Sequence, residues 1–292
     1  MRVLVTGGGG QLATAVASTR PDDVDLHVLG IDELDITNET AVRRIIGDLN
    51  PEIIINTAAY TAVDAAESDE AVAASVNGDG PRNLAEAIRT GPARMIQVST
   101  DFVFDGTATR PLKVDDPTRP LSVYGRTKLA GEAAVLEALG PRALVVRTAW
   151  LHSSGGGNFP KTMLRLMRER GSVRVVDDQT GTPTWAGSLA DALWCMIDRR
   201  MDGIHHWTDD GSATWHRFAV AVAEIGVELG LLEAMPEVTP VPGSEFPTPA
   251  SRPAYSVLDR AATLQELEGT RCVPCAHWRE NLKRMMEELN GG

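Results

Sequence analysis

The sequence predicts an α/β fold built on a Rossmann-like, doubly wound parallel sheet, followed by a smaller C-terminal domain. Short apolar runs without polar alternation recur through the first half of the chain, and such runs are typical of strands buried on both faces. Segments with helical spacing separate these runs, and a glycine run follows the first of them. Strands that alternate with helices pair in parallel through right-handed crossovers, which makes the sheet doubly wound.

The elements of the first half follow one another from the N-terminus. The apolar run at 3–5 is rich in β-branched residues and closes at Gly7, and helix formers resume at 12–17. The same pattern predicts strands at 26–30, 53–55, 95–98 and 143–146, and helices at 40–49, 81–89 and 124–139. We therefore expect a nucleotide-binding domain over residues 1–150.

The rhythm of strands and helices changes after Trp150. We expect a glycine-rich loop at 153–157, a strand at 173–176, and irregular chain over the proline-dense stretch 236–253. Helical spacing recurs at 159–170, 188–199, 215–230 and 277–289. Residues 151–292 are thus predicted to form mainly a smaller cap, with part of 173–215 returning to the first domain.

Length, charge and hydropathy exclude several classes of protein. A chain of 292 residues is long enough to bury a core in one large or two modest domains. Its net charge of −12 disfavours nucleic acid and anionic membranes as partners. The N-terminus reaches glycine too early for a signal peptide, and apolar runs stay well below the roughly 18 residues of a membrane span. We expect a cytoplasmic protein.

Cysteine usage agrees with a reducing compartment. Cys195, Cys272 and Cys275 form an odd set in a long chain, which argues against a disulfide framework. The C-x-x-C spacing of Cys272 and Cys275 also occurs in zinc and redox sites, but a second such pair is missing from the sequence. Ordinary thiols are the favoured interpretation.

The glycine run between the first strand and the first helix indicates a dinucleotide site. Bare backbone N–H groups at a helix N-terminus bind pyrophosphate, and Gly7, Gly10 and Ala13 have the spacing Gly-x-x-Gly-x-x-Ala. A simple tight turn is the alternative. An acid is expected roughly 20 residues further on to bind the ribose of NAD. Asp32 can take this role if the second strand runs past Gly30, whereas the acid is missing if the strand ends there. The same stretch also lacks an Arg suited to the 2′-phosphate of NADPH. The sequence therefore leaves the choice between NADH and NADPH open.

Two groups of residues carry candidate chemistry. Tyr124 and Lys128 are four residues apart on a predicted helix and share one face, where an ammonium about 5 Å away is expected to lower the phenol pKa by roughly two units. An exposed Tyr/Lys pair is the alternative. Thr100 and Asp101 end a parallel strand, at the sheet edge where ligands bind. There we expect Thr100 to donate to a substrate oxygen, and Asp101 to accept from a sugar hydroxyl or from a loop N–H. A polar strand-end turn is the alternative there.

Taken in series, these motifs resemble the extended short-chain dehydrogenase/reductase family, and within it the dTDP-4-dehydrorhamnose reductases. The matching stretches run in family order over nearly the whole chain, at 6–12, 34–37, 56–64 with Glu67, 99–101, 123–132, 147–150, 158–159, 161–163, 177–184 and 249–253.

The resemblance implies NADPH- or NADH-dependent reduction of the 4-keto group of a dTDP-6-deoxy-hexulose to dTDP-L-rhamnose, with a substrate-binding C-terminal domain. The resemblance further implies that Tyr124 supplies the proton and that Lys128 holds the nicotinamide ribose. Thr100 and Asp101 would complete the catalytic group. The implied cofactor residues are Gly7, Gly10, Gln11, Leu12, Asp35, Ile36, Ala58, Ala59, Tyr60, Asn77, Tyr124 and Lys128. The implied substrate residues are Val63, Thr100, Phe102, Trp150, Asn158, Lys161 and Arg252.

The chain departs from the family pattern at two places. Phe102 stands where many relatives carry Tyr, so the hydrogen bond of that phenol is lost. The stretch 185–188 lacks the carboxylate that supports a magnesium-bridged dimer in some relatives, so we expect no metal requirement and either a monomer or a homodimer.

Three other functions share this fold. A 4,6-dehydratase or epimerase is disfavoured because apolar Phe102 follows Asp101, where elimination needs a second acid. A catalytically silent nucleotide-binding subunit is disfavoured by the intact pair Tyr124 and Lys128. A 4-ketoreductase of another nucleotide-6-deoxysugar pathway is compatible with the same motifs.

Overall fold

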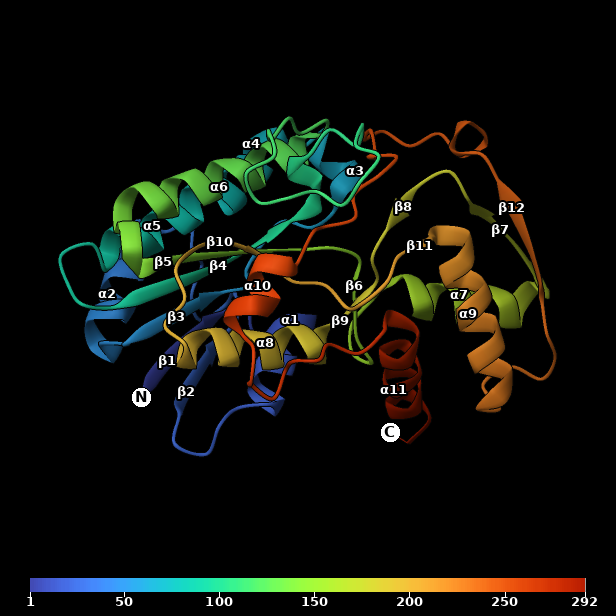
Figure 1. The fold of residues 1–292 in the computed structure, drawn as a ribbon. Coiled ribbons are helices and arrows are strands. Elements are labelled where there is room, and N and C mark those ends of the chain that lie inside the picture. Colours follow the sequence, from blue (N-terminus) through green and yellow to red (C-terminus); the bar gives the residue numbers. More distant parts are fainter. Residues whose placement is uncertain (292) are drawn as a thin grey trace.

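The structure is a computed structural model that describes residues 1–291. Within these residues, six parallel strands form the central sheet in the order β10-β5-β4-β3-β1-β2 (Figure 1). The strands are β1 (Arg2–Thr6), β2 (Asp25–Leu29), β3 (Ile53–Asn56), β4 (Arg94–Thr100), β5 (Ala143–Thr148) and β10 (Gly203–His206). This order reverses direction at β1, as in doubly wound folds, and confirms the predicted fold class.

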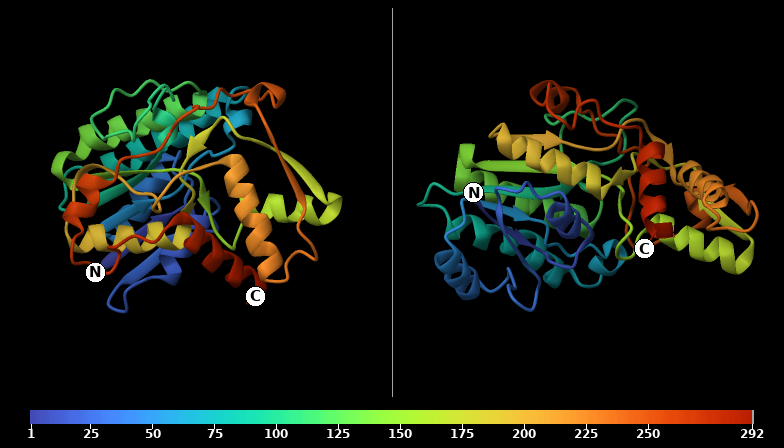
Figure 2. Two further views of the ribbon diagram at one scale, coloured as in Figure 1. Left: turned by 45° about the vertical axis from the view of Figure 1, so that its right-hand side comes forward. Right: turned by 90° about the horizontal axis from the view of Figure 1, so that it is seen from below.

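Helices cover both faces of the central sheet (Figures 1 and 2). On one face, α1 (Gln11–Ser18) and α8 (Ala186–Asp198) share a buried apolar core with β1 and β3. On the other face, α2 (Glu39–Leu49), α5 (Gly80–Ala87) and α6 (Val123–Leu139) enclose a second core. Because both faces are covered, the strands are apolar throughout, which is the pattern seen in the sequence.

A smaller unit lies beside the carboxyl end of the sheet (Figure 1). Its helices α7 (Phe159–Arg170), α9 (Trp215–Glu228) and α11 (Trp278–Gly291) pack around β7 (Ser172–Val176) and β12 (Glu237–Val241), which pair in parallel. The short strands β6 (Leu151–His152), β8 (Thr180–Gly181), β9 (Thr184–Trp185) and β11 (Ala213–Thr214) run between the two parts. The stretch expected to return to the first domain contributes α8 and β10 to it.

Several elements differ from the expectation. The stretch 236–253, predicted as irregular, contains β12, because a proline is tolerated on an edge strand such as this one. Strand β10 was not predicted, because His205 and His206 interrupt its apolar pattern at the sheet edge. Further short helices are α3 (Val63–Ala66), α4 (Glu70–Ala74), the π-helical turn η1 (Ser75–Asp79), α10 (Ala261–Glu266) and the 3-10 turns η2 (Asp101–Val103), η3 (Gly140–Arg142) and η4 (Gly243–Glu245). Across residues 1–291, every helix is too short or too polar to traverse a lipid bilayer.

Candidate active site

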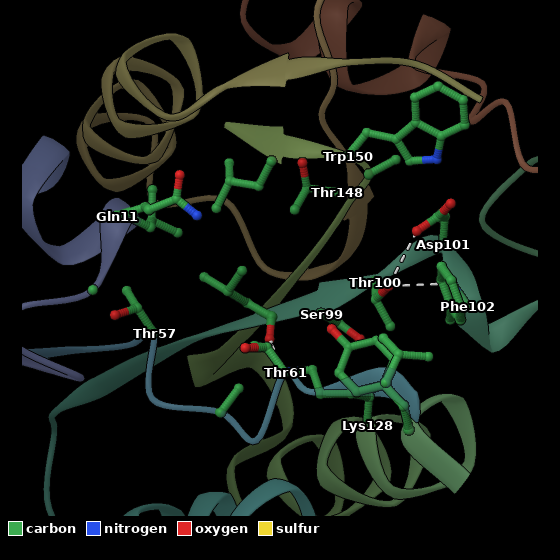
Figure 3. Close-up of a pocket in the computed structure, with 18 of the residues that line it drawn as sticks. Gln11, Thr57, Thr61, Ser99, Thr100, Asp101, Phe102, Lys128, Thr148 and Trp150 are labelled. Carbon is green, nitrogen blue, oxygen red and sulfur yellow. Dashed lines mark hydrogen bonds between the residues drawn. The ribbon is translucent and has the colours of Figure 1, made fainter. Parts of the chain in front are cut away.

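A cavity of about 670 Å³ opens at the carboxyl ends of the central strands, between the sheet and the smaller unit (Figure 3). Its lining includes most of the site residues that the sequence indicates, namely Gly7, Gly10, Gln11, Leu12, Ala58, Ala59, Val63, Thr100, Asp101, Phe102, Tyr124, Lys128, Trp150 and Arg252. The remaining candidates, Asp35, Ile36, Tyr60, Asn77, Asn158 and Lys161, lie outside this lining.

The glycine turn forms one end of the cavity. Gly7 has a φ of +80°, and a Cβ at this position would lie 2.7 Å from the backbone nitrogen of Ala58. A Cβ on Gly10 would lie 2.9 Å from the Gly7 carbonyl oxygen, and α1 begins directly after it. Backbone N–H groups at the start of a helix, free of side chains, are the donor set that a pyrophosphate requires. The residues present therefore fit a dinucleotide.

Gln11 links the glycine turn to the smaller unit. Its Oε1 accepts hydrogen bonds from Ser153 Oγ at 3.0 Å and from Asn158 Nδ2 at 2.9 Å. Asn158 also caps α7, because its Oδ1 accepts from the backbone N–H of Lys161. Asn158 and Lys161 thus stabilise the glycine-rich loop, and Gly156 and Gly157 of that loop face the cavity.

Thr100 and Tyr124 meet at the centre of the cavity. Thr100 ends β4, and its hydroxyl donates to Asp101 Oδ1 at 3.1 Å (Figure 3). Tyr124 lies in the first turn of α6, where Ser122 Oγ caps the helix by accepting from Gly125 N. A Cβ on Gly125 would lie 2.2 Å from the Phe102 carbonyl oxygen, so only glycine lets the helix approach the strand end this closely.

Burial sets the ionisation of the Tyr/Lys pair. It raises the pKa of Tyr124 to about 12, although a hydrogen bond with Thr100 lowers this pKa in part. Burial lowers the pKa of Lys128 to about 8, and its ammonium donates to the Val98 carbonyl oxygen at 2.6 Å. The expectation that Lys128 lowers the phenol pKa by roughly two units is therefore wrong for this arrangement, because the desolvation of the phenol dominates. Tyr124 is protonated at neutral pH and can serve as a proton donor.

A buried ionic network connects the strand that carries Thr100 to the helix that carries Tyr124. Glu132, one helical turn after Lys128, accepts from Ser99 Oγ at 2.5 Å and from Arg147 Nη2 at 2.7 Å. These bonds join α6 to the ends of β4 and β5. Removing one partner of such a buried pair leaves an uncompensated charge, which destabilises the fold.

Asp101 presents a buried carboxylate beside Thr100. Burial raises its pKa to about 6, while hydrogen bonds from Ser256 and Thr100 oppose this rise. Its Oδ2 atom has no hydrogen-bond partner among residues 1–291. Asp101 also lines the cavity, so its carboxylate stands at the cavity wall, with Oδ2 itself shielded from solvent.

An aromatic wall of two indoles, Trp150 and Trp215, lines the cavity. The rings of Trp150 and Trp215 stack with centroids 3.5 Å apart and an interplanar angle of 9°. Trp150 has a φ of +48°, and a Cβ on Gly181 would lie 2.6 Å from its indole. Trp215 and Gly181 thus hold the Trp150 indole in place, and both indoles line the cavity. Flat apolar faces of this kind pack against a sugar ring or a base.

Arg252 lines the cavity and is paired with Asp64. Its Nη2 donates to Asp64 Oδ2 at 2.8 Å, and the backbone N–H of Ala250 donates to Asp64 Oδ1. This guanidinium lowers the pKa of Asp64 below its usual value. The ion pair joins the proline-rich stretch to the short helix α3, which follows β3.

The candidates outside the cavity stabilise the parts around it. Asn77 Oδ1 accepts from Tyr60 N at 2.9 Å, which holds the loop that contributes Ala58 and Ala59 to the lining. Asp35 accepts from both the backbone and the hydroxyl of Thr37, and Ile36 is buried in the core under α2 and α5.

Sequence reasoning placed Thr57, Thr61 and Ser99 within stretches expected to line the site, but it did not single out Thr148 or Trp215, which also line the cavity. Thr148 stands at a strand end, so the rule that predicted Thr100 would have found it. Trp215 gives no such signal, because helix α9 comes from a distant part of the chain.

Several proteins that are named as reductases match this chain over nearly its whole length. A dTDP-4-dehydrorhamnose reductase of Mycobacterium tuberculosis is 44% identical and covers 96% of this chain and 91% of its own. A Streptomyces antibioticus protein, named as a probable dTDP-4,6-dihydroxy-2-methyloxan-3-one 4-ketoreductase, is 43% identical, with 99% and 96% covered. The crystal structure of a Bacillus anthracis dTDP-4-dehydrorhamnose reductase in complex with NADP superposes with a TM-score of 0.91 at 34% identity, covering 98% and 99%.

The fold and the site together define a nicotinamide-dependent reductase of the short-chain dehydrogenase/reductase type, with a glycine turn facing a buried Tyr/Lys pair across one cavity. The model of the family described as RmlD substrate binding domain matches residues 1–290, and the chain belongs to this family. The resemblance inferred from the sequence motifs is thereby confirmed.

Proposed function

We propose that this chain reduces the 4-keto group of dTDP-4-dehydrorhamnose (dTDP-6-deoxy-L-lyxo-4-hexulose) to dTDP-L-rhamnose with NADPH or NADH. The observation that carries the proposal is the convergence of Tyr124, Lys128 and Thr100 in one cavity with the glycine turn. Relatives named dTDP-4-dehydrorhamnose reductase that span the same length support the substrate class.

In this proposal the reduced nicotinamide supplies the hydride that reaches C4 of the sugar. Tyr124 donates its proton to the oxygen as it becomes an alkoxide, a base strong enough to take a proton even from a phenol whose pKa is about 12. The Thr100 hydroxyl donates to the same oxygen, which stabilises the charge as it develops. Lys128 binds the nicotinamide ribose.

The cofactor contacts are proposed at the glycine turn and at the loop after β3. Gly7, Gly10 and the first residues of α1, Gln11 and Leu12, would hold the pyrophosphate, because their backbone is accessible from the cavity. The loop with Ala58 and Ala59 would lie along the nicotinamide half. Supporting roles are proposed for Asp35, Ile36, Tyr60 and Asn77, which shape the surrounding loops.

The substrate contacts are proposed on the remaining walls. Trp150 would pack on the hexose, with Val63 and Phe102 beside it, and the Asp101 carboxylate would accept from a sugar hydroxyl. Arg252 would bind the diphosphate, which suits the two parallel donors of a guanidinium. Asn158 and Lys161 would act indirectly through the glycine-rich loop.

A second candidate is a 4-ketoreductase that acts on a different dTDP-deoxysugar. The Streptomyces antibioticus relative favours it, because the substrate in its name differs while its sequence identity to this chain is similarly high. Residues around the sugar, such as Phe102 in place of a tyrosine, would then select the substrate. We further propose a cytoplasmic enzyme that works as a monomer or homodimer, without a metal requirement.

The direct experiment measures oxidation of NADH and of NADPH at 340 nm with the enzymatically prepared 4-keto-6-deoxy sugar nucleotide, carrying either dTDP or UDP. We expect oxidation with the dTDP sugar and a product that co-elutes with dTDP-L-rhamnose. A reduced product other than dTDP-L-rhamnose would support the second candidate. Absence of oxidation under every combination would contradict both candidates.

A further inference from the structure

The end of strand β2 adjoins the glycine turn. The backbone N–H of Gly8 donates to the Leu29 carbonyl oxygen at 2.9 Å, and a Cβ on Gly8 would lie 2.8 Å from the nitrogen of Gly30. In folds of this topology, the adenosine ribose of a dinucleotide lies at this point, where an acid binds the 2′-hydroxyl of NAD or an arginine accepts the 2′-phosphate of NADP. The charges around Gly30 therefore decide between the two cofactors.

Glu33 places its carboxylate against the end of β2. Gly30 lacks a side chain that could bind the ribose, but its backbone N–H donates a hydrogen bond to Glu33 Oε2 at 3.0 Å. Asp35, the other candidate, already accepts two hydrogen bonds from Thr37 and thereby closes its own turn. Exposed Asp32 adds a further negative charge to the same turn. Glu33 thus occupies the position, about 20 residues past the glycines, where an acid that binds a ribose is expected.

The arginines of the elements around this turn are already paired with carboxylates. On α2, Arg43 pairs with Glu39 at 2.8 Å and Arg44 lies 3.7 Å from Asp48.

On α5, which packs against the same turn through Asn83, Arg82 pairs with Asp79 at 2.6 Å. A 2′-phosphate bound here would meet the Glu33 carboxylate with the nearby guanidinium groups engaged elsewhere. Like charges held close together weaken binding, whereas a ribose hydroxyl donates favourably to a carboxylate.

We propose that this chain binds NADH in preference to NADPH, and that Glu33 sets the preference. The inference rests on the proposed function, because it concerns the cofactor of that reduction, and it goes beyond it by assigning the choice between two cofactors to one side chain. Since the hydrogen bond between Glu33 and Gly30 also stabilises the turn, the test must separate the charge of Glu33 from its role as an acceptor.

The experiment measures dissociation constants for NADH and NADPH by isothermal titration calorimetry, with no sugar substrate present. For the unmodified chain we expect NADH to bind at least about tenfold more tightly. Glu33→Gln keeps an acceptor oxygen for Gly30 N–H and removes the charge, so the preference should shrink to roughly threefold or less, with NADPH binding more tightly than before. Glu33→Arg should reverse the preference.

Glu137→Gln is the matched control, since it removes the same charge from the exposed face of α6 and should leave the preference unchanged. A gain in NADPH affinity cannot arise from partial unfolding, so the Glu33→Gln result is specific. Equal or tighter binding of NADPH to the unmodified chain, or an unchanged ratio in Glu33→Gln, would overturn this inference and leave the proposed function intact. Failure of both dinucleotides to bind would overturn the proposed function as well.

Discussion

The two ends of the cavity are built in different ways. At the end proposed for the cofactor, the glycine turn presents backbone, and its residues are neighbours in the sequence. At the end proposed for the substrate, the walls are side chains from distant segments: Trp150 stacks on Trp215, and Arg252 pairs with Asp64 across 188 residues of chain. The cofactor end therefore depends on the space that glycines leave, and the substrate end depends on pairs of side chains that hold one another in position.

The largest effect is expected where the two ends meet. Replacing Tyr124 with Phe removes the proton donor and retains the ring, so kcat should fall by about 10²–10⁴-fold while the Kd for NADH changes little. Steady-state kinetics and calorimetry on the same preparation measure both quantities. Turnover within a fewfold of the unmodified enzyme would show that the proton comes from another group.

The cofactor end should be sensitive to a single methyl group. In Gly7→Ala, the new Cβ meets the Ala58 backbone at 2.7 Å, and the φ of +80° disfavours any side chain, so dinucleotide affinity should fall by roughly tenfold or more. Gly171→Ala is the matched control, because Gly171 has a φ of +69° with open space around its Cβ and lies far from the turn at the end of α7. Thermal unfolding reports the cost of the backbone strain in both variants, and equal dinucleotide affinity in the two would contradict the steric argument.

At the substrate end, the stack of indoles should control substrate affinity. Trp215→Ala leaves Trp150 without its partner, and an aromatic pair of this kind contributes about 0.5–1.5 kcal/mol, so KM for the sugar nucleotide should rise by roughly two- to tenfold. Trp215→Phe preserves a flat neighbour and should restore most of the affinity. The circular dichroism couplet of the two stacked indoles gives a readout that is independent of activity. An unchanged KM in Trp215→Ala would remove Trp215 from the substrate end.

The ion pair at the rim should have a smaller effect, because solvent screens it. Asp64→Asn keeps the shape and removes the charge that orients Arg252, so KM should rise by about two- to fivefold with the Kd for NADH unchanged. The control is Glu70→Gln, which weakens an exposed pair with Arg126 on the neighbouring helix. Matching values of KM in the two variants would show that Asp64 does not orient Arg252.

The last expected effect concerns stability and not catalysis, and it is a dependence of stability on pH. The pKa of Asp101 is raised from 3.8 to about 6 in the folded state, so between these values the folded state binds more protons than the unfolded state. The contribution of Asp101 to the free energy of unfolding therefore falls as pH rises from about 4 to about 6. Denaturant titrations of the enzyme and of Asp101→Asn at several pH values isolate this contribution, and parallel curves would contradict it.

The same comparison explains what the sequence could predict. The glycine turn and the pair Tyr124 and Lys128 are local in sequence, so periodicity and spacing were enough to place them. The stacking of Trp215 on Trp150 and the pairing of Asp64 with Arg252 depend on how the two parts of the fold meet, which spacing along the chain does not encode. The raised pKa of Tyr124 depends on burial in the same way. Strand β12 was not predicted, because Pro240 is typical of a loop, although an edge strand tolerates a proline.

The reaction itself offers the most direct test of how the two ends cooperate. A reduced nicotinamide cofactor carrying deuterium at its transferable position would be supplied with the 4-keto sugar nucleotide, and the product examined by NMR. Direct transfer at the junction of the two ends predicts one deuterium at C4 of the hexose. Deuterium at another carbon, or a reduced sugar whose new C4 hydrogen derives from solvent, would contradict the account.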